Sequence, residues 1–305
     1  MIRISLIIAT HNRSQPLIEA LGSVVRQDLP PGEWECVVVN NNSADDTEAR
    51  FAAFAAQHPG LNLRMVFEPN PGLSHARNRG LRETAAPLIA VIDDDERINA
   101  GFLRAYASFF DACPEAVAAG GRIIAEYPAG RPDWMSRYTE QPIANPMDFG
   151  PEVRPFPAGR IPGGGNMAFR RTVVAKYGDF DPALGRVNGR LTGGEESDFF
   201  ERLTRGGETL WYVPDAVMWH IIPPQKLTLD YFRRLCRNVG ASQRLRAQRD
   251  HRLPKAFAAE CVKWAATLLL ALGYLLRLSP RKALWLLRLR RGISRGLFGV
   301  GKCGA

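Results

Sequence analysis

Three consecutive aspartates, Asp93, Asp94 and Asp95, are the side chains of this sequence best suited to bind a cation. They follow the apolar run at residues 88–92, which is typical of a buried strand. Carboxylates a few ångströms apart repel one another unless a cation neutralises them, and their hard oxygen atoms favour Mg²⁺ or Mn²⁺. Diphosphate oxygens can fill the remaining coordination positions of such an ion. The triplet therefore predicts phosphate chemistry, and an acidic loop without a ligand is the alternative.

The segments around the triplet alternate between strand-like and helix-like patterns. Apolar runs typical of strands lie at residues 4–9, 35–39, 61–67, 88–92 and 117–124. Amphipathic stretches typical of helices lie between them, at residues 15–27, 45–57, 74–84 and 102–112. This alternation predicts a mostly parallel central sheet flanked by helices.

Polar side chains follow three of the predicted strands. Thr10 and Asn12 come after the first strand, Asn40 and Asn42 after the second, and the aspartates after the fourth. In open parallel sheets, ligands bind outside the carboxyl ends of the strands. Each cluster alone could form a turn or a helix cap. Together they predict one pocket at this edge of the sheet.

Length, composition and cysteine usage exclude several classes of protein. The chain has 305 residues, of which 46% are hydrophobic and 23% charged, which suits one large α/β domain with an appendage. Its five cysteines are scattered without metal-ligand spacing, so neither a disulfide framework nor a zinc site is expected. The first apolar run is too short for a signal peptide, and we expect a cytoplasmic protein.

The basic charge of the chain is concentrated in its last quarter. Residues 231–305 contain 17 Lys and Arg but only two acids, Asp250 and Glu260. An apolar run at residues 264–276 lies among them and is shorter than the roughly 18–20 residues of a spanning helix. Apolar helices with Trp, Tyr and Arg suit a membrane interface, so we expect a monotopic anchor. Helices that pack on the domain with a solvated basic face are one alternative. Nucleic-acid binding is another, although no recognition motif accompanies the basic charge.

Four segments, in their order and spacing, resemble successive signatures of family-2 glycosyltransferases. They lie at residues 5–13, 37–47, 70–80 and 92–96. The resemblance covers roughly residues 1–225. It implies a GT-A fold, a nucleotide-sugar donor, a divalent metal ion and an inverting reaction.

The expected organisation follows from this resemblance and from the basic tail. A GT-A glycosyltransferase domain would occupy residues 1–228, with a nucleotide-sugar-binding half at 1–125 and an acceptor half at 126–228. A basic, amphipathic and apolar helical region that associates with the membrane would occupy residues 229–305.

The resemblance also implies roles for individual residues. The expected donor-binding residues are Ala9, Thr10, Asn12, Arg13, Asn40, Asn42, Arg77, Asp93 and Asp94. The glycine-rich residues 163–171 resemble the segment that lines the acceptor and donor-sugar pocket, which makes Gly164, Gly165 and Asn166 the expected acceptor-binding residues. The expected ligands of Mn²⁺ or Mg²⁺ are Asp95, Asp93 and His220.

Residues 193–202 resemble the segment that opens a helix with the catalytic base. Glu195 and Glu196 stand where the family usually has Glu-Asp, so Glu196 takes the position of the base and Glu195 accompanies it. A base must be an ionised carboxylate within hydrogen-bond reach of the acceptor hydroxyl, and a helix N-terminus favours ionisation. The alternative is that these acids only complement the helix dipole.

Two departures from the family pattern bear on the substrates. Asn40 replaces an aspartate that usually helps to hold uracil, and because an amide can donate as well as accept a hydrogen bond, the preference for the nucleotide base is open. A UDP-sugar remains the first expectation, with GDP and dTDP sugars behind. Residues 243–247 lack the tryptophan of the Gln-x-x-Arg-Trp segment, which favours transfer of a single sugar over processive synthesis.

The function expected from the resemblance and the tail is hexosyl transfer in the assembly of surface or extracellular polysaccharide. The acceptor would be a polyprenyl-diphosphate-linked saccharide at the inner face of the cell membrane. Two other classes remain as alternatives. A nucleotidyltransferase would usually carry a glycine-rich phosphate loop after its first strand, and residues 10–14 contain no glycine. A noncatalytic carbohydrate-binding or scaffold protein could retain the fold.

Overall fold

A computed structural model describes residues 1–186 and 193–300 of the chain. The chain forms two compact units, and it passes between them several times. The first unit consists of Met1–Ile124, Met147–Asn188 and Glu195–Ile221. The second consists of Ala125–Pro146, Gly189–Gly194 and Ile222–Ala305. The expected domain bounds at residues 228 and 229 stay a prediction.

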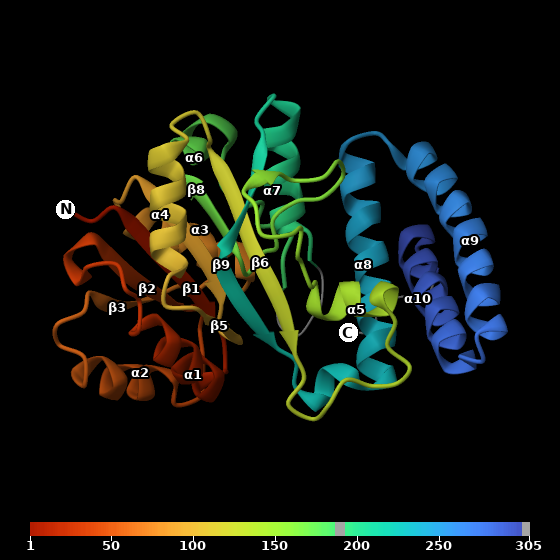
Figure 1. The fold of residues 1–305 in the computed structure, drawn as a ribbon, viewed down its shortest axis with the longest axis horizontal. Helices are drawn as coiled ribbons and strands as arrows, with labels where there is room; N and C mark the ends of the chain where they lie inside the picture. Colours follow the sequence, from red (N-terminus) through yellow and green to blue (C-terminus); the bar gives the residue numbers. More distant parts are fainter. Residues whose placement is uncertain (187–192, 301–305) are drawn as a thin grey trace. The chain divides into compact units, whose positions relative to one another are not determined.

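The described strands form one nine-stranded sheet in the order β3-β2-β1-β4-β8-β6-β9-β5, with β7 paired to β9 (Figure 1). Their bounds are β1 Ile4–Thr10, β2 Trp34–Asn40, β3 Leu63–Phe67, β4 Leu88–Asp93, β5 Glu96–Ile98, β6 Ala118–Glu126, β7 Arg154–Pro155, β8 Met167–Arg170 and β9 Leu210–Ile221. The first four strands pair in parallel, as the sequence predicts. Beyond β4 the sheet becomes mixed, because β8 runs antiparallel to β4 and β5 antiparallel to β9.

The order of the first four strands places the polar strand ends together. The chain moves from β1 outward to β2 and β3, and then returns to the other side of β1 with β4. Such a reversal leaves a crevice at the carboxyl ends of the two strands on either side of it. Ala9 on β1 lies directly opposite Asp93 on β4. The last residues of β1 and the aspartate triplet are therefore neighbours.

Helices cover both faces of the sheet in the first unit (Figure 1). Side chains of a strand alternate between the two faces, so Leu6 and Ile8 of β1 belong to one core and Ile7 and Ala9 to the other. The first core includes side chains of α1 Ser14–Val24, α2 Thr47–Ala56 and α4 Phe102–Ala112. The second includes side chains of α3 Leu73–Glu83, α6 Thr172–Tyr177 and α7 Glu195–Arg205. Short 3-10 turns lie at Pro31–Glu33 and Pro224–Leu227.

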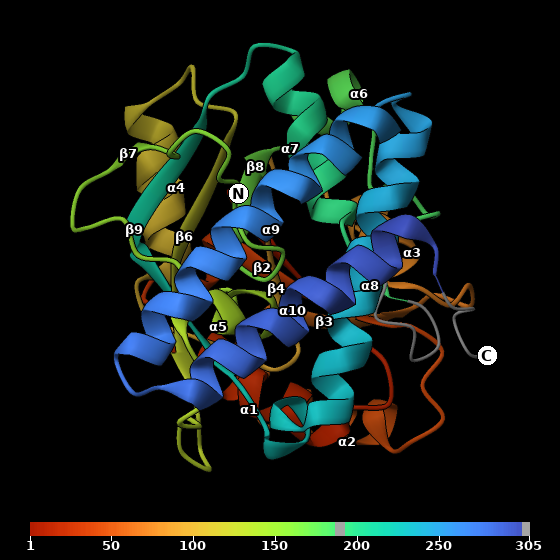
Figure 2. The same cartoon turned by 90° about the vertical axis from the view of Figure 1, so that its right-hand side faces the viewer.

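The second unit is helical and has its own core. Its helices are α5 Arg137–Ala144, α8 Leu229–Arg249, α9 Leu253–Leu276 and α10 Pro280–Phe298, and Figure 2 shows α9 and α10 side by side. Trp134 stacks on Trp285 with ring centroids 3.6 Å apart, and Phe232 packs against both rings. α8 and α10 approach so closely that a Cβ on Gly240 would lie 1.9 Å from the carbonyl oxygen of Ile293.

Among the described residues, α9 is the one helix that is long and apolar enough to cross a membrane, judged by length and composition alone. The apolar run read from the sequence was too short, because the helix begins at Leu253 and extends for 24 residues. The helix includes residues before the apolar run, among them Glu260, whose carboxylate bonds Arg290 and Ser294 within the unit.

Candidate active site

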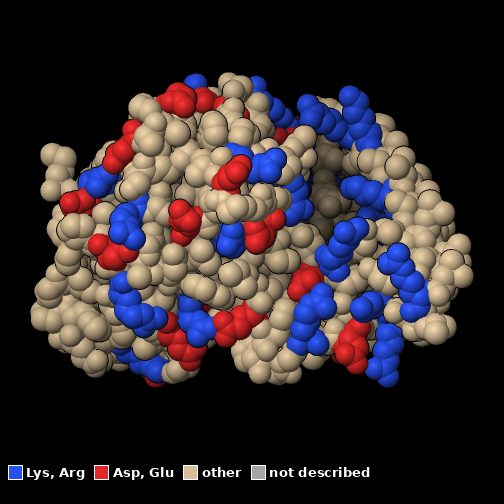
Figure 3. Space-filling view, viewed as in Figure 1, with Lys and Arg blue, Asp and Glu red and all other residues tan. Residues whose placement is uncertain are grey.

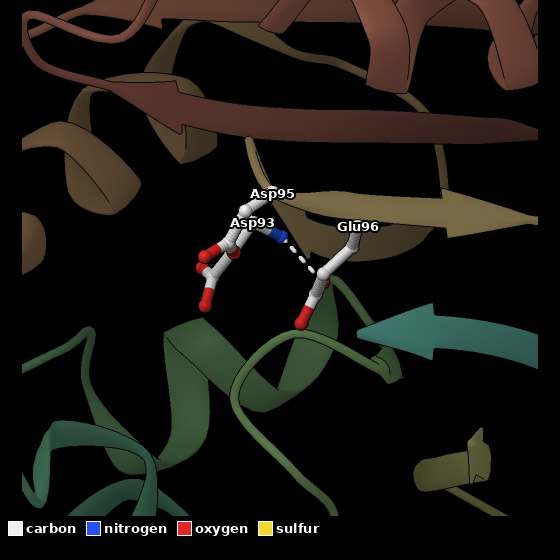
Figure 4. A group of neighbouring side chains, drawn as sticks. All are labelled: Asp93, Asp95 and Glu96. Atoms are coloured by element: carbon white, nitrogen blue, oxygen red, sulfur yellow. Dashed lines mark hydrogen bonds between the residues drawn. The ribbon is translucent and has the colours of Figure 1, made fainter. Parts of the chain in front are cut away.

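Three acidic side chains meet at the end of β4 in the first unit. Single oxygen atoms of Asp93, Asp95 and Glu96 all lie within 4.8 Å of one another. Figure 4 shows the carboxylates of Asp93 and Asp95 side by side, with that of Glu96 facing them. An oxygen of Glu96 accepts a hydrogen bond of 2.7 Å from the backbone N–H of Asp93, which holds the turn between β4 and β5.

The geometry and chemistry of this acidic cluster fit a divalent metal ion. Two oxygens on opposite sides of a Mg²⁺ or Mn²⁺ ion are about 4.2 Å apart, so small side-chain rotations would complete the coordination. The donor atoms are all carboxylate oxygens, which these hard cations prefer. The side chain of Asp93 is 32% exposed, so an ion can reach it from solvent.

Asp94 points to β1 and is held there by two contacts. One oxygen accepts a hydrogen bond from the Thr10 hydroxyl, and the other forms an ion pair with the Arg13 guanidinium, both at 2.8 Å. Arg13 also bonds Asp95 at 3.0 Å. Burial raises the pKa of Asp94 to about 7, against the effect of Arg13 and with added repulsion from Asp95. The structure therefore brings together three of the predicted donor-binding residues, Thr10, Arg13 and Asp94.

Arg77 on α3 links the aspartate triplet to α7. Its guanidinium is 1% exposed and donates to Asp93 at 2.9 Å, to Glu195 at 2.8 Å and to the carbonyl oxygen of Gly164 at 2.9 Å. Arg77 is one of the expected donor-binding residues, and that role stays a prediction. Its three protein contacts hold the carboxylates of Asp93 and Glu195 and the glycine loop in place.

Glu195 and Glu196 both stand at the N-terminus of α7, but they differ in solvent exposure. Glu195 is buried against Arg77, whereas Glu196 is partly exposed. A Cβ on Gly164 would lie 3.6 Å from Cγ of Glu196, so the side chain of Glu196 lies beside the glycine loop. Burial raises the pKa of Glu195 to about 7, repulsion from Glu196 adds to the shift, and Arg77 opposes it. Of the two, Glu196 is the carboxylate that a substrate can reach.

The raised pKa of Glu195 predicts a specific dependence of stability on pH. Its folded pKa of about 7 exceeds an unfolded value of roughly 4.3, so the folded chain binds more protons between these values. The contribution of Glu195 to the free energy of unfolding is therefore fully present below about pH 4 and is lost as the pH rises through 7. We expect the stability of the wild type relative to Glu195→Gln to fall between pH 5 and pH 8, measured by urea unfolding in EDTA. A difference that stays constant over this range would contradict the assignment.

The asparagines after β2 differ in what they contact. Asn40 is buried and accepts a bond from the backbone N–H of Ser43 at 3.0 Å, which shapes the loop. Asn42 and Asn12 are exposed and both have positive φ, 57° and 53°. Asn12 also accepts a bond from the N–H of Ala44 at 2.7 Å, so the loops after β1 and β2 are joined. Asn12 and Asn42 are thus exposed at the strand ends, whereas the side chain of Asn40 supports the loop after β2.

Packing and hydrogen bonds within the protein explain the residue types at two of the predicted acceptor positions, Gly165 and Asn166. A Cβ on Gly165 would lie 1.9 Å from a carboxylate oxygen of Glu96, so the position requires glycine. Asn166 is fully buried, and its amide donates to the carbonyl oxygens of Arg122 at 2.9 Å and Ala216 at 3.0 Å. These contacts indicate a structural role for the Asn166 side chain. The loop backbone at Gly164 and Gly165 lies next to Arg77 and Glu96.

His220 lies at the edge of the acidic cluster. It is paired with Glu96 in the register of β5 and β9, and its Nε2 is 3.8 Å from an oxygen of Asp95. This distance is too long for a hydrogen bond, but both atoms can approach a shared ion by small rotations. The structure thus places His220 beside the predicted metal ligands.

Two further residues, Glu96 and Asn41, shape the site although their sequence positions predicted no role for them. Glu96 directly follows the aspartates, and the fourth acid in a row was its only signal. Asn41 is buried and fixes the loops through bonds to the carbonyl oxygens of Glu68 and Asn70 and from the N–H of Gly72. Nothing in the sequence separates Asn41 from the asparagines on either side of it.

Comparisons with known proteins agree on a family and a fold. The sequence model described as "Glycosyl transferase family 2" matches residues 5–178, more than half of the chain. The succinoglycan biosynthesis protein ExoM of Rhizobium meliloti is 25% identical over 254 residues, which cover 82% of this chain and 77% of that protein. The glucosyl-dolichyl phosphate glucuronosyltransferase of Haloferax volcanii is 23% identical over 241 residues, covering 75% of this chain and 72% of that protein.

A solved structure shows the same fold over nearly the whole chain. The mannosyltransferase PcManGT of Pyrobaculum calidifontis, in complex with GDP-Man and Mn²⁺, superposes with a TM-score of 0.65 at 21% sequence identity. The match covers 98% of this chain and 88% of that one.

Proposed function

The chain belongs to glycosyl transferase family 2 and has a GT-A fold, and from this premise we propose that it transfers one hexose, with inversion, from a nucleotide-diphosphate sugar to a saccharide hydroxyl. The observation that best supports this proposal is the pair of contacts that Arg77 makes with Asp93 and Glu195, here called the Arg77 bridge. It joins Asp93 of the acidic cluster to Glu195, the residue before the partly exposed Glu196. One rigid arrangement therefore holds a cluster suited to a metal–diphosphate and a carboxylate suited to a general base.

The reaction proposed for this site is a direct displacement at the anomeric carbon. Glu196 accepts the proton of the acceptor hydroxyl, whose oxygen forms the new bond to the anomeric carbon. The bond from that carbon to the diphosphate oxygen breaks on the opposite side, which inverts the configuration. Thr10, Asn12, Arg13 and Asn42 lie at the strand ends where the nucleotide would bind.

Asp93 and Asp95, with His220 beside them, are the proposed ligands of Mn²⁺ or Mg²⁺. When bound there, the ion would neutralise negative charge that builds up on the leaving diphosphate. Arg13 lies against Asp95 and is one-third exposed, so it can contribute positive charge to the same diphosphate. Glu96 holds the turn through the N–H of Asp93, and we assign it no direct contact with substrate.

The proposed acceptor is a lipid-linked saccharide in surface or extracellular polysaccharide assembly. Two compared proteins support this class, one named for succinoglycan biosynthesis and one for glucosyl-dolichyl phosphate. The proposed location is the cytoplasmic face of the cell membrane, with attachment through residues 229–305. We propose UDP as the nucleotide because of the sequence resemblance. GDP is the main alternative, because the compared mannosyltransferase was solved with GDP-Man.

Thermal unfolding with nucleotides tests the donor and metal sites together. A ligand that binds only the folded state raises the melting temperature, and a concentration 100-fold above Kd adds about 2.7 kcal/mol to the free energy of unfolding. We expect UDP with Mn²⁺ to raise Tm and the same nucleotide with EDTA to have no effect. GDP, dTDP and CMP are the matched comparisons, and a shift by one of them instead would reassign the base.

The identity of the released product distinguishes the proposed reaction from its alternatives. A glycosyltransferase releases the nucleoside diphosphate, whereas a nucleotidyltransferase releases pyrophosphate from a nucleoside triphosphate. Absence of any nucleotide-dependent shift, together with no released diphosphate, would favour a noncatalytic protein.

A further inference from the structure

Helix α9 has its polar and apolar faces reversed relative to a helix of a water-soluble unit. Its buried residues are Glu260, Thr267 and Ala271, and the Glu260 carboxylate is 1% exposed. That carboxylate accepts bonds from Arg290 at 3.0 Å and from the Ser294 hydroxyl at 2.7 Å, both on α10. The polar stripe of α9 therefore faces its neighbour within the unit.

The opposite side of α9 presents a continuous apolar surface, here called the α9 face. Its members are Val262, Leu268, Leu269, Leu272, Leu275 and Leu276, with exposed fractions from 50% to 77%. Leu278, just beyond the helix, is 90% exposed. Single exposed leucines are common on protein surfaces, but a contiguous stripe of them along one helix indicates an interaction surface.

A cavity with an excess of cations lies at the end of α9, where the chain turns into α10. It measures about 480 Å³, and Leu278 is part of its wall. Arg131, Arg281 and Lys282 also line it, against one acid, Asp133. Arg131 is already paired with Glu140 at 2.8 Å, so Arg281 and Lys282 supply most of the net positive charge.

The first turn of α10 also favours an anion in this cavity, here called the tip cavity. Arg281 and Lys282 stand in that turn, which contains no acidic residue, and no side chain caps the helix start. Cations at the positive end of a helix are unfavourable unless an anion compensates them. On the face drawn in Figure 3, Lys and Arg gather over the C-terminal helices with few Asp and Glu between them.

We propose that the α9 face and the tip cavity together dock onto an anionic bilayer, with α9 lying along the surface and the tip cavity holding a phospholipid phosphate. This inference rests on the proposed membrane attachment of residues 229–305 and deepens it by naming the residues and the lipid charge. A bilayer supplies apolar and anionic groups side by side, which is what the two neighbouring surfaces require.

The structure argues against two other occupants or orientations. A second copy of the chain whose α9 packed in parallel would bring like-charged tip cavities together, which is unfavourable, and an antiparallel pair would leave the cations of both tip cavities without an anion. If α9 crossed the bilayer instead, its partner α10 would carry Arg288, Arg290 and Arg291 into the hydrocarbon, which is costly. Docking along the surface leaves these cations at the depth of the headgroups.

Vesicle sedimentation of the full chain tests the proposal. Phosphatidylcholine vesicles with and without phosphatidylglycerol are compared at equal lipid concentration. The wild type should bind the anionic vesicles more strongly. Because one cation near anionic lipid typically changes binding about fivefold, Arg281→Ser with Lys282→Ser should weaken it roughly 25-fold. Leu269→Ser with Leu276→Ser should weaken binding to both kinds of vesicle.

The matched control removes two cations from the first unit, Arg26→Ser with Arg82→Ser, and should leave vesicle binding unchanged. Equal binding of wild type to both vesicles, or unchanged binding of the Arg281/Lys282 variant, would overturn the proposal. A wild-type chain that binds neither kind of vesicle and instead dimerises through the α9 face would also overturn the proposal. Nucleotide-dependent Tm shifts of all variants should match the wild type. Their loss in every protein would instead refute the donor site, and this separates the two proposals.

Discussion

The substitution Glu196→Gln should lower kcat by about 10²–10⁴-fold while leaving nucleotide binding intact. Glutamine keeps the size of the side chain but cannot accept the proton of the acceptor hydroxyl. Glu196 is partly exposed beside Gly164, so the change should alter the free energy of unfolding by less than about 1 kcal/mol. The measurements are steady-state transfer with a saccharide acceptor and the Tm shift with nucleotide and Mn²⁺.

A matched control lies on the same helix. Glu201→Gln makes the same chemical change at an exposed position paired with Arg205, and it should retain transfer. If Glu195→Gln lost transfer and Glu196→Gln did not, the catalytic base would be reassigned to the buried Glu195. Full transfer by Glu196→Gln would refute the base assignment outright.

The substitution Asp95→Asn should remove metal-dependent turnover, at a cost of about 10³-fold in kcat. Asp95 contributes one oxygen to the acidic cluster, and its charge also adds to the raised pKa of Asp94. Removing that charge relieves a repulsion but also weakens the bond from Arg13 to Asp95. The two effects oppose each other, so in EDTA the stability of the variant should stay within about 1 kcal/mol of the wild type. In Mn²⁺ with nucleotide it should gain no stability, whereas the wild type should.

This pair of results separates a metal ligand from a structural residue, because a structural aspartate would lose stability under both conditions. Asp111→Asn at the exposed end of α4 is the control and should keep the nucleotide-dependent shift. A complete Mn²⁺-dependent shift in Asp95→Asn would show that the ion binds elsewhere.

The parts of the site that the sequence predicts are those governed by strand ends. Thr10 and the aspartates follow apolar runs, and the carboxyl ends of neighbouring parallel strands must meet. Their proximity therefore follows from local pattern and topology. The resemblance adds the family and the fold, which the comparisons confirm.

The rest of the site depends on contacts between distant parts of the chain. Arg77 and Glu195 are 118 residues apart, and nothing in either helical pattern pairs them. Asn40, Asn41 and Asn42 look alike in sequence, yet two are buried supports and one is exposed. Asn166 is likewise a polar residue whose burial only the fold reveals.

The C-terminal region shows the same division. Periodicity predicts that the leucines of α9 share a face, but it does not say which face is covered. The polar stripe of Glu260 and Thr267 could equally have faced solvent. Its bonds to α10 settle the direction, and they turn the leucines outward.

The Arg77 bridge also bears on how such a protein can diversify. A single buried guanidinium contacts one carboxylate on the donor side of the site and one on the acceptor side, so replacing Arg77 would leave both without their buried cation and would cost stability. Asn12 and Asn42 stand on exposed loop positions outside this pair of contacts, and both have positive φ, which asparagine and glycine adopt more readily than most residues. Exchanges at these two loop positions should therefore be limited to residues that accept positive φ, whereas a change at Arg77 would act on both carboxylates at once.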